Sequence, residues 1–184
     1  KHIGWDIGAE EVCHQLIKKL DMPAVIASYS RLVVDLNRAP AHRECMAETS
    51  DNIKVPANKG LTKTQKDQRL KEIFWPYQKE IGKQAGRFTK KRQTKRVIQE
   101  IRKAHPDLLV GENEPYSLKD ERFTGSTICR HGEERGLPYV FVEFRQDLVD
   151  TKEKAAKWAD IFVRALQPVL GNLESFQAAK PRKK

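Results

Sequence analysis

The order of apolar segments along the chain is the sequence feature that most restricts its fold. Short apolar runs, rich in β-branched and aromatic residues, alternate with segments whose apolar residues recur at helical spacing. The run 137–144 is the strongest strand candidate, and 24–27, 32–36 and 108–110 are shorter ones. Strands that alternate with helices predict an α/β fold with a mixed, mostly parallel sheet flanked by helices.

Four helices are expected between and after these strands. They cover 9–20, 62–81, a short stretch around 97–101, and a last helix that begins at 150–153 and continues to residue 166. The second begins with a capping-box pattern, Thr62-Lys-Thr-Gln65, and Pro76 is expected to kink it. With 184 residues, no internal repeat and one continuous pattern, we expect a single domain over 1–184.

Composition excludes several classes of protein. No run of 18 or more apolar residues is present, so no membrane span is expected, and no signal-peptide pattern is found. The three cysteines are odd in number and far apart, which argues against a disulfide framework and fits the reducing cytoplasm.

The net charge of +10 is concentrated in the segment 83–103 and in the tail 180–184. A basic run can bind nucleic acid, but this one contains a single aromatic residue, Phe88, and lacks the stacking pattern of a single-strand binder. We therefore favour a solvated helix face over a nucleic-acid site, while an anionic membrane surface and a small anionic substrate stay open as partners. Nothing in the pattern indicates an oligomeric state.

Polar clusters follow three of the predicted strands. They are Asp35-Leu-Asn-Arg38, Glu112-Asn-Glu114 and Glu143-Phe-Arg-Gln-Asp147. In open α/β sheets the ligand site lies at the carboxyl ends of the strands. If the strands are parallel, the three clusters converge on one functional site.

Glu143 is the sharpest single candidate because it lies inside the run 137–144. Burial in a core strand would raise the pKa of its carboxyl and suit it to act as a general base. The alternative is a structural ion pair with Arg145 or Arg38, and the sequence does not separate the two.

Five further residues are candidates for the site. Asn37 and Arg38 form a donor pair that matches a carboxylate, with Arg31 as a further contact, although arginines also clamp loops. Asp6 precedes the first helix and is either a metal ligand or a helix cap. His131 lies in a Gly-flanked loop before the best strand, and we predict that it contacts the substrate or handles protons.

Seven segments together carry a recognisable pattern, and the pieces around Asn37-Arg38 and Glu143 are the most specific of them. The segments are 2–9, 29–38, 50–58, 75–77, 110–117, 131–138 and 142–148. In this order they resemble the N-formylglutamate amidohydrolases and, more distantly, zinc carboxypeptidases. The resemblance implies a zinc-exopeptidase-like (phosphorylase/hydrolase-like) α/β fold.

The resemblance also implies an activity, the hydrolysis of N-formyl-L-glutamate to L-glutamate and formate with the help of Zn²⁺. Glu143 would be the base, and Asn37, Arg38 and Arg31 would hold a substrate carboxylate. Further substrate contacts are expected from Asn113, Tyr116, His131 and Arg145. Asp6 is the single candidate metal ligand.

The chain departs from the family in its histidines. The family has one His-bearing loop before the segment that matches residue 2, and a second between those that match 75–77 and 110–114. We therefore expect an N-terminal segment and a segment near 82–95 to be missing, or the chain to be a relative that has lost its metal. The alternatives in function are hydrolysis of another N-acyl amino acid or a C-terminal peptide, and binding of acidic amino acids without catalysis.

Overall fold

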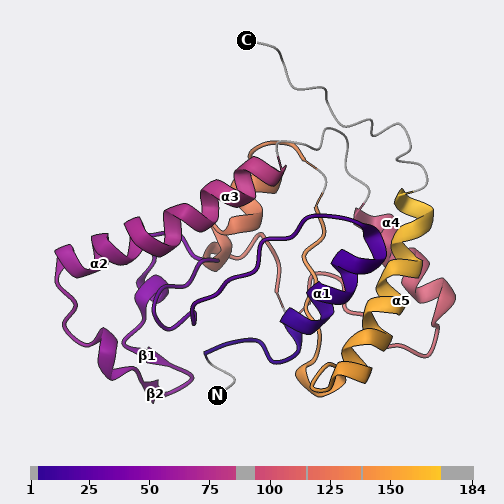
Figure 1. Ribbon diagram of the computed structural model, residues 1–184, viewed down its shortest axis with the longest axis horizontal. Helices are drawn as coiled ribbons and strands as arrows, with labels where there is room; N and C mark the ends of the chain where they lie inside the picture. The colour runs from indigo at the N-terminus through magenta and orange to yellow at the C-terminus, as the bar shows by residue number, and fades with distance from the viewer. Residues whose placement is uncertain (1–3, 86–93, 115, 138, 171–184) are drawn as a thin grey trace, which may run out of the picture.

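A computed structural model describes residues 4–85, 94–114, 116–137 and 139–170 (Figure 1). Its main helices are α1 (Ala9–Leu20), α2 (Lys63–Arg69), α3 (Trp75–Ala85), α4 (Thr94–Ala104) and α5 (Lys152–Leu170). Shorter helical turns are η1 (Arg43–Met46), η2 (Pro56–Asn58), η3 (Leu70–Phe74), η4 (Glu121–Phe123), η5 (Cys129–Glu133) and η6 (Gln146–Leu148). The strands are β1 (Thr49–Ser50) and β2 (Ile53–Lys54).

The helices form two groups with extended chain between them. In Figure 1, α1, α4 and α5 gather at one side, where α5 packs against both of the others, and the continuous rod of α2 and α3 lies at the other side. Extended segments run between the two groups (Figure 1). The molecule is thus a single domain that mixes helices with a small sheet.

The sheet differs from the sequence-based expectation. Within the described ranges, the one ladder joins β1 to β2, and it is antiparallel, with Thr49 opposite Lys54 and Ser50 opposite Ile53. The runs expected as strands are not strands in their described residues; they are 24–27, 32–36, 108–110, and 137 with 139–144. A strand requires a partner for its backbone hydrogen bonds, and apolar character alone does not provide one. The prediction of a mostly parallel sheet is therefore not confirmed.

The helix α1 has the predicted bounds and packs against α5. It begins after Gly8, whose φ of 82° lies in the left-handed region, and ends at Asp21, which is also left-handed. Its Val12 lies in a buried cluster with Val149 of the chain before α5 and with Ala155 and Ala159 of α5. Small residues on α5 allow α1 to approach closely.

The rod of α2, η3 and α3 follows the sequence closely. Thr62 and Gln65 form the predicted capping box at its beginning. Directly before Pro76, the chain widens into the π-helical turn η3, in which the backbone N–H of Trp75 donates to Leu70 O. Proline offers no N–H and crowds the preceding turn, and a π-helical turn relieves this without breaking the rod.

This rod holds the first polar cluster in place. Phe74, with no exposed surface, packs on Val34 and Leu36. Asn58, 2% exposed, donates from Nδ2 to Leu32 O at 2.8 Å, and its Oδ1 accepts from Arg69 Nη1 at 2.7 Å. The segment that carries Asp35 to Arg38 is therefore fixed by packing and hydrogen bonds rather than by a sheet. Of the helices in the described ranges, none has the length and apolar character to cross a membrane.

Candidate active site

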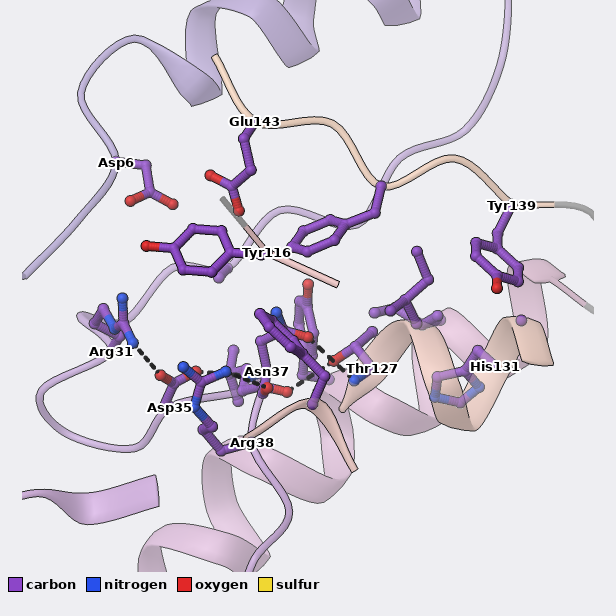
Figure 2. Close-up of a pocket in the computed structure, with 18 of the residues that line it drawn as sticks. Asp6, Arg31, Asp35, Asn37, Arg38, Tyr116, Thr127, His131, Tyr139 and Glu143 are labelled. Atoms are coloured by element: carbon purple, nitrogen blue, oxygen red, sulfur yellow. Dashed lines mark hydrogen bonds and ion pairs between the residues drawn. The ribbon is translucent and has the colours of Figure 1, made fainter. Parts of the chain in front are cut away.

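A cleft of about 1260 Å³ opens between the two helical groups. Its lining brings together the segment after Val34, the chain before α1, the turn η5 and the run around residue 141. Seven of the predicted site residues line it: Asp6, Arg31, Asn37, Arg38, Tyr116, His131 and Glu143. Figure 2 shows that Arg31, Asn37 and Arg38 share one segment, while the others come from separate parts of the chain around one open space.

Asp35 organises the first cluster. It is 5% exposed, and its Oδ2 accepts from Arg31 Nη2 at 2.6 Å. Its Oδ1 accepts from the backbone N–H of Asn37 at 2.9 Å, which closes a tight turn. One carboxylate thus ties the guanidinium of Arg31 to the turn that presents Asn37 and Arg38.

The guanidinium of Arg38 has fewer partners than a buried cation usually has. Its side chain is 12% exposed, and its Nε lies 3.5 Å from Glu44 Oε2 and has no hydrogen-bond partner. The Cζ atom lies 5.2 Å from the ring centroid of Phe123, a cation–π contact. A largely covered guanidinium whose Nε has no partner, and whose Nη1 makes only a 3.5 Å contact with Asn37 O, suits a carboxylate ligand.

Asn37 is held by its side-chain oxygen. The backbone N–H of Thr127 donates to Asn37 Oδ1 at 3.2 Å. A backbone N–H can only donate, so Oδ1 faces Thr127 and the Nδ2 donors are turned away from it. Asn37 and Arg38 together therefore form a donor clamp at one wall of the cleft.

Glu143 lies across the cleft from this clamp, with its carboxylate directed toward that of Asp6 (Figure 2). Partial desolvation raises the pKa of Glu143, the negative charge of Asp6 raises it further, and Arg31 opposes the rise. The residue is exposed to the cleft rather than buried in a core strand, as the sequence had suggested. Desolvation remains the larger cause of the rise in the pKa, and the charge of Asp6 adds to it.

Two structural alternatives for these carboxylates are not observed among the described residues. Asp6 does not cap α1, because the N-cap position is Gly8 and no side chain caps this end. Glu143 forms no ion pair with Arg145 or Arg38 among the ion pairs of the described residues. Both carboxylates are left directed into the cleft.

His131 lies at the other end of the cleft, in a π-helical turn and not in the expected loop. Its Nε2 is 2.9 Å from Gln78 Oε1. Burial lowers the pKa of the imidazole, and the charges of Arg135 and Arg130 lower it further. His131 thus contacts Gln78 of α3 directly, and it is linked to the donor clamp only through Gln78 and its hydrogen bonds to Leu36 O and Thr127.

Two predicted contacts are not brought to the cleft. Asn113 is exposed, with a φ of 58°, and is absent from the lining. Arg145 is also absent from it and donates to both carboxylate oxygens of Asp147, at 2.7 and 2.9 Å. The three polar clusters thus converge only in part, because no parallel sheet aligns the strand ends.

Three residues of the site escaped the sequence-based search. Phe123 stacks on Arg38, Thr127 holds Asn37, and Gln78 bonds to His131. Gln78 carries one sequence signal, since it lies at helical spacing from the buried Phe74 and yet is polar. A buried amide on an apolar helix face requires hydrogen-bond partners.

The described residues do not by themselves fit a zinc ion. Asp6 and Glu143 provide two carboxylates, whereas zinc in proteins takes three or four ligands, mostly histidine and cysteine. No group of three or more such ligands occurs in the part of the chain that the structure describes. The stretch near 82–95, where a histidine loop was expected, falls largely at 86–93, outside the described residues.

Comparison with known proteins identifies the family to which the chain belongs. The profile of the family described as N-formylglutamate amidohydrolase matches residues 1–98. The match spans more than half of the 184 residues, and the chain belongs to the N-formylglutamate amidohydrolase family. This membership places it among the hydrolases that act on C–N bonds. No curated protein matches the chain.

A solved structure resembles the fold. The crystal structure of gene product Atu2144 from Agrobacterium tumefaciens superposes with a TM-score of 0.73 at 20% sequence identity. The alignment covers 92% of this chain and 79% of that one. At this identity the likeness concerns the fold alone.

Proposed function

We propose that the chain hydrolyses the amide bond of N-formyl-L-glutamate to give L-glutamate and formate. The observation that carries the proposal is that one cleft contains both Arg38, a cation with a 12% exposed side chain whose Nε has no hydrogen-bond partner, and Glu143, a carboxyl with a raised pKa. The first suits an anionic substrate, and the second suits a base that acts on water.

Substrate binding begins at the donor clamp. Arg38 and Asn37 hold one carboxylate of the substrate, and the ring of Phe123 keeps the guanidinium flat against the wall. Glu44 is displaced at little cost, because its 3.5 Å contact with Arg38 Nε is a weak one. The clamp fixes the formyl amide toward the side of the cleft that carries Glu143 and Asp6.

The chemical step uses one water molecule. Its oxygen forms a bond to the formyl carbon while Glu143 takes the proton. The C–N bond then breaks, and Glu143 passes the proton to the leaving nitrogen. Arg31, near Glu143, contributes positive charge where the oxyanion develops.

Zinc dependence is a separate prediction that comes from the family resemblance. Asp6 and Glu143 alone do not make a zinc site, and no step above passes through a metal. Metal analysis of the purified chain, with activity measured before and after chelation, tests it. Loss of formate release on chelation, restored by Zn²⁺, would support it, and an unchanged rate would count against it.

The test of activity is release of formate from N-formyl-L-glutamate, followed by NMR. We expect turnover by the wild type and a loss of roughly 10²- to 10⁴-fold in kcat for Glu143→Gln, which keeps the shape of the side chain but cannot take a proton. Lack of turnover by the wild type, or a full rate in the variant, would refute the assignment.

A second candidate is a related substrate with a larger acyl group. A cleft of about 1260 Å³ exceeds what a formyl group requires, and much of its lining is apolar, including Tyr77, Ile81 and Phe141. Comparison of kcat/KM for N-formyl-, N-acetyl- and N-hexanoyl-L-glutamate separates the two. A preference for the longer acyl chains would favour the second candidate.

A further inference from the structure

We propose that Thr127 and Gln78, with His131 behind them, are positioning residues that set the orientation of Asn37 in the donor clamp. The identity of the ligand in this inference rests on the proposed function, whereas the hydrogen bonds that carry it are independent of that function. It concerns residues that do not themselves touch the substrate carboxylate.

The connection passes through one carbonyl, Leu36 O. It accepts from Gln78 Nε2 at 2.8 Å and from Thr127 Oγ1 at 2.7 Å, and Gln78 Nε2 also donates to Thr127 Oγ1 at 3.0 Å. Three groups from three parts of the chain thus meet at the residue before Asn37. Figure 2 shows Thr127 beside Asn37, with His131 beyond it.

The same segment also holds the side chain of Asn37. The backbone N–H of Thr127 donates to Asn37 Oδ1 at 3.2 Å, so Thr127 bonds to both the backbone before Asn37 and its amide. If the hydrogen bond from Thr127 Oγ1 to Leu36 O is lost, the segment of Thr127 can move relative to the segment of Leu36 and Asn37. The Nδ2 donors of Asn37 then lose their fixed direction. A clamp that must meet a carboxylate loses affinity when its donors are free to turn.

The carbonyl Leu36 O fixes the direction of these hydrogen bonds, because it can only accept, and His131 follows from it. Gln78 is 3% exposed, and its Nε2 already donates twice, so its Oε1 must accept from His131 Nε2–H. The proton therefore lies on Nε2 in the neutral imidazole, and it stays there when Nδ1 is protonated. The arrangement is the same on both sides of the imidazole titration.

The kinetic test compares Thr127→Val, which keeps the shape of the side chain, with Thr127→Ser, which keeps the hydroxyl. We expect Thr127→Val to raise KM for N-formyl-L-glutamate roughly three- to tenfold with little change in kcat, since about one hydrogen bond is lost from binding. Thr127→Ser, which keeps the hydroxyl, should have a KM close to that of the wild type. In an Asn37→Ala background, Thr127→Val should have no further effect, because the residue it positions is absent.

The structural test requires no activity. In ¹⁵N NMR spectra of the wild type recorded over a range of pH, we expect the neutral imidazole of His131 to be the Nε2–H tautomer. We also expect Thr127→Val, and not Thr127→Ser, to shift or broaden the side-chain amide signals of Asn37. An Nδ1–H tautomer, or unchanged Asn37 signals in folded Thr127→Val, would overturn the proposal. A wild type that releases no formate would refute the proposed function and leave this test to decide the positioning role.

Discussion

At the scale of single residues, the site depends on a difference between two arginines, Arg31 and Arg38, in how their guanidinium groups are paired. Arg31 also lines the cleft, but its Nη2 is committed to Asp35 at 2.6 Å. Arg38 has weaker contacts: its Nε lies 3.5 Å from Glu44, its Nη1 donates to Asn37 O at 3.5 Å, and its guanidinium lies over the ring of Phe123. Two arginines seven positions apart thus differ in how firmly their donors are held: Arg31 Nη2 holds the turn through Asp35, whereas Arg38 Nε has no hydrogen-bond partner.

The first prediction concerns the geometry of Arg38. Arg38→Lys keeps the charge but loses the planar fork and the stacking on Phe123. We expect kcat/KM for N-formyl-L-glutamate to fall roughly 10- to 100-fold, mostly through KM, which corresponds to one charged hydrogen bond of about 1.5–3 kcal/mol. Steady-state kinetics measure it. Arg145→Lys is the matched control, because Arg145 lies outside the cleft and pairs with Asp147. An equal loss in both variants would contradict the assignment of the clamp to Arg38.

The second prediction concerns pH. Glu143 must be ionised to take a proton, so kcat/KM falls as the pH drops through its pKa, and the raised pKa places this midpoint above the ordinary value of 4.5. Removal of the nearby charge by Asp6→Asn should lower the midpoint, because Asp6 raises the pKa of Glu143. A pH profile of kcat/KM in both proteins provides the measurement. A midpoint that rises or stays the same in Asp6→Asn would show that another group titrates.

At the scale of elements, close contacts between helices and turns set the position of the carboxylates. Asp6 precedes α1, and α1 begins at a left-handed Gly8 that lies directly against the chain before α5. Glu143 lies shortly before Val149 in the sequence, in the chain that leads to α5. The approach of α1 to α5 therefore determines how close the two carboxylates lie.

The third prediction tests this approach. A Cβ at Gly8 would lie 1.9 Å from Val149 O, whereas a Cβ at Gly60 would meet nothing within 4 Å, and both residues have positive φ. Gly60→Ala should cost only the left-handed backbone, about 1–2 kcal/mol in free energy of unfolding. Gly8→Ala should cost about 1–3 kcal/mol more, because the contact must open. Urea denaturation of both variants gives the comparison, and equal losses would mean that Gly8 is not in close contact.

At the scale of the whole molecule, the cleft lies between two helical groups that have separate cores. One core contains Val12, Val149, Ala155 and Ala159, and the other contains Val34, Leu36, Cys45 and Phe74. The donor clamp of Asn37 and Arg38 lies on the side of the core that contains Phe74. The carboxylates of Asp6 and Glu143 lie on the side of the core that contains Val12. A ligand that contacts both sides should therefore stabilise the molecule as a whole.

The fourth prediction follows from this arrangement. At a concentration of 100 times its Kd, a ligand that binds only the folded state adds about 2.7 kcal/mol. For a chain of this size this raises Tm by roughly 5–10 °C. We expect such a rise with L-glutamate in thermal unfolding of wild type, and none with Arg38→Ala. L-Glutamine and L-lysine serve as ligand controls. A similar rise with L-lysine would show that the cleft does not select an anion.

Much of the local structure follows from the sequence. The bounds of α1, the capping box of Thr62 and Gln65, and the last helix all follow from short-range periodicity and side-chain chemistry. The clamp residues Asn37 and Arg38 and the carboxylate of Glu143 stood out because they follow or interrupt apolar runs. These are properties of neighbours along the chain, which the sequence contains directly.

The tertiary structure decided the rest, because it depends on partners far apart in the sequence. The apolar run 137–144 looked like a strand, but a strand needs a paired neighbour, and the described part of the chain provides none for it. Gln78, Thr127 and Phe123 have no motif, and only packing brings them to the clamp across 40 residues or more. Local pattern thus determined which residues could carry charge and chemistry, while long-range packing determined which of them meet and which donors remain unused.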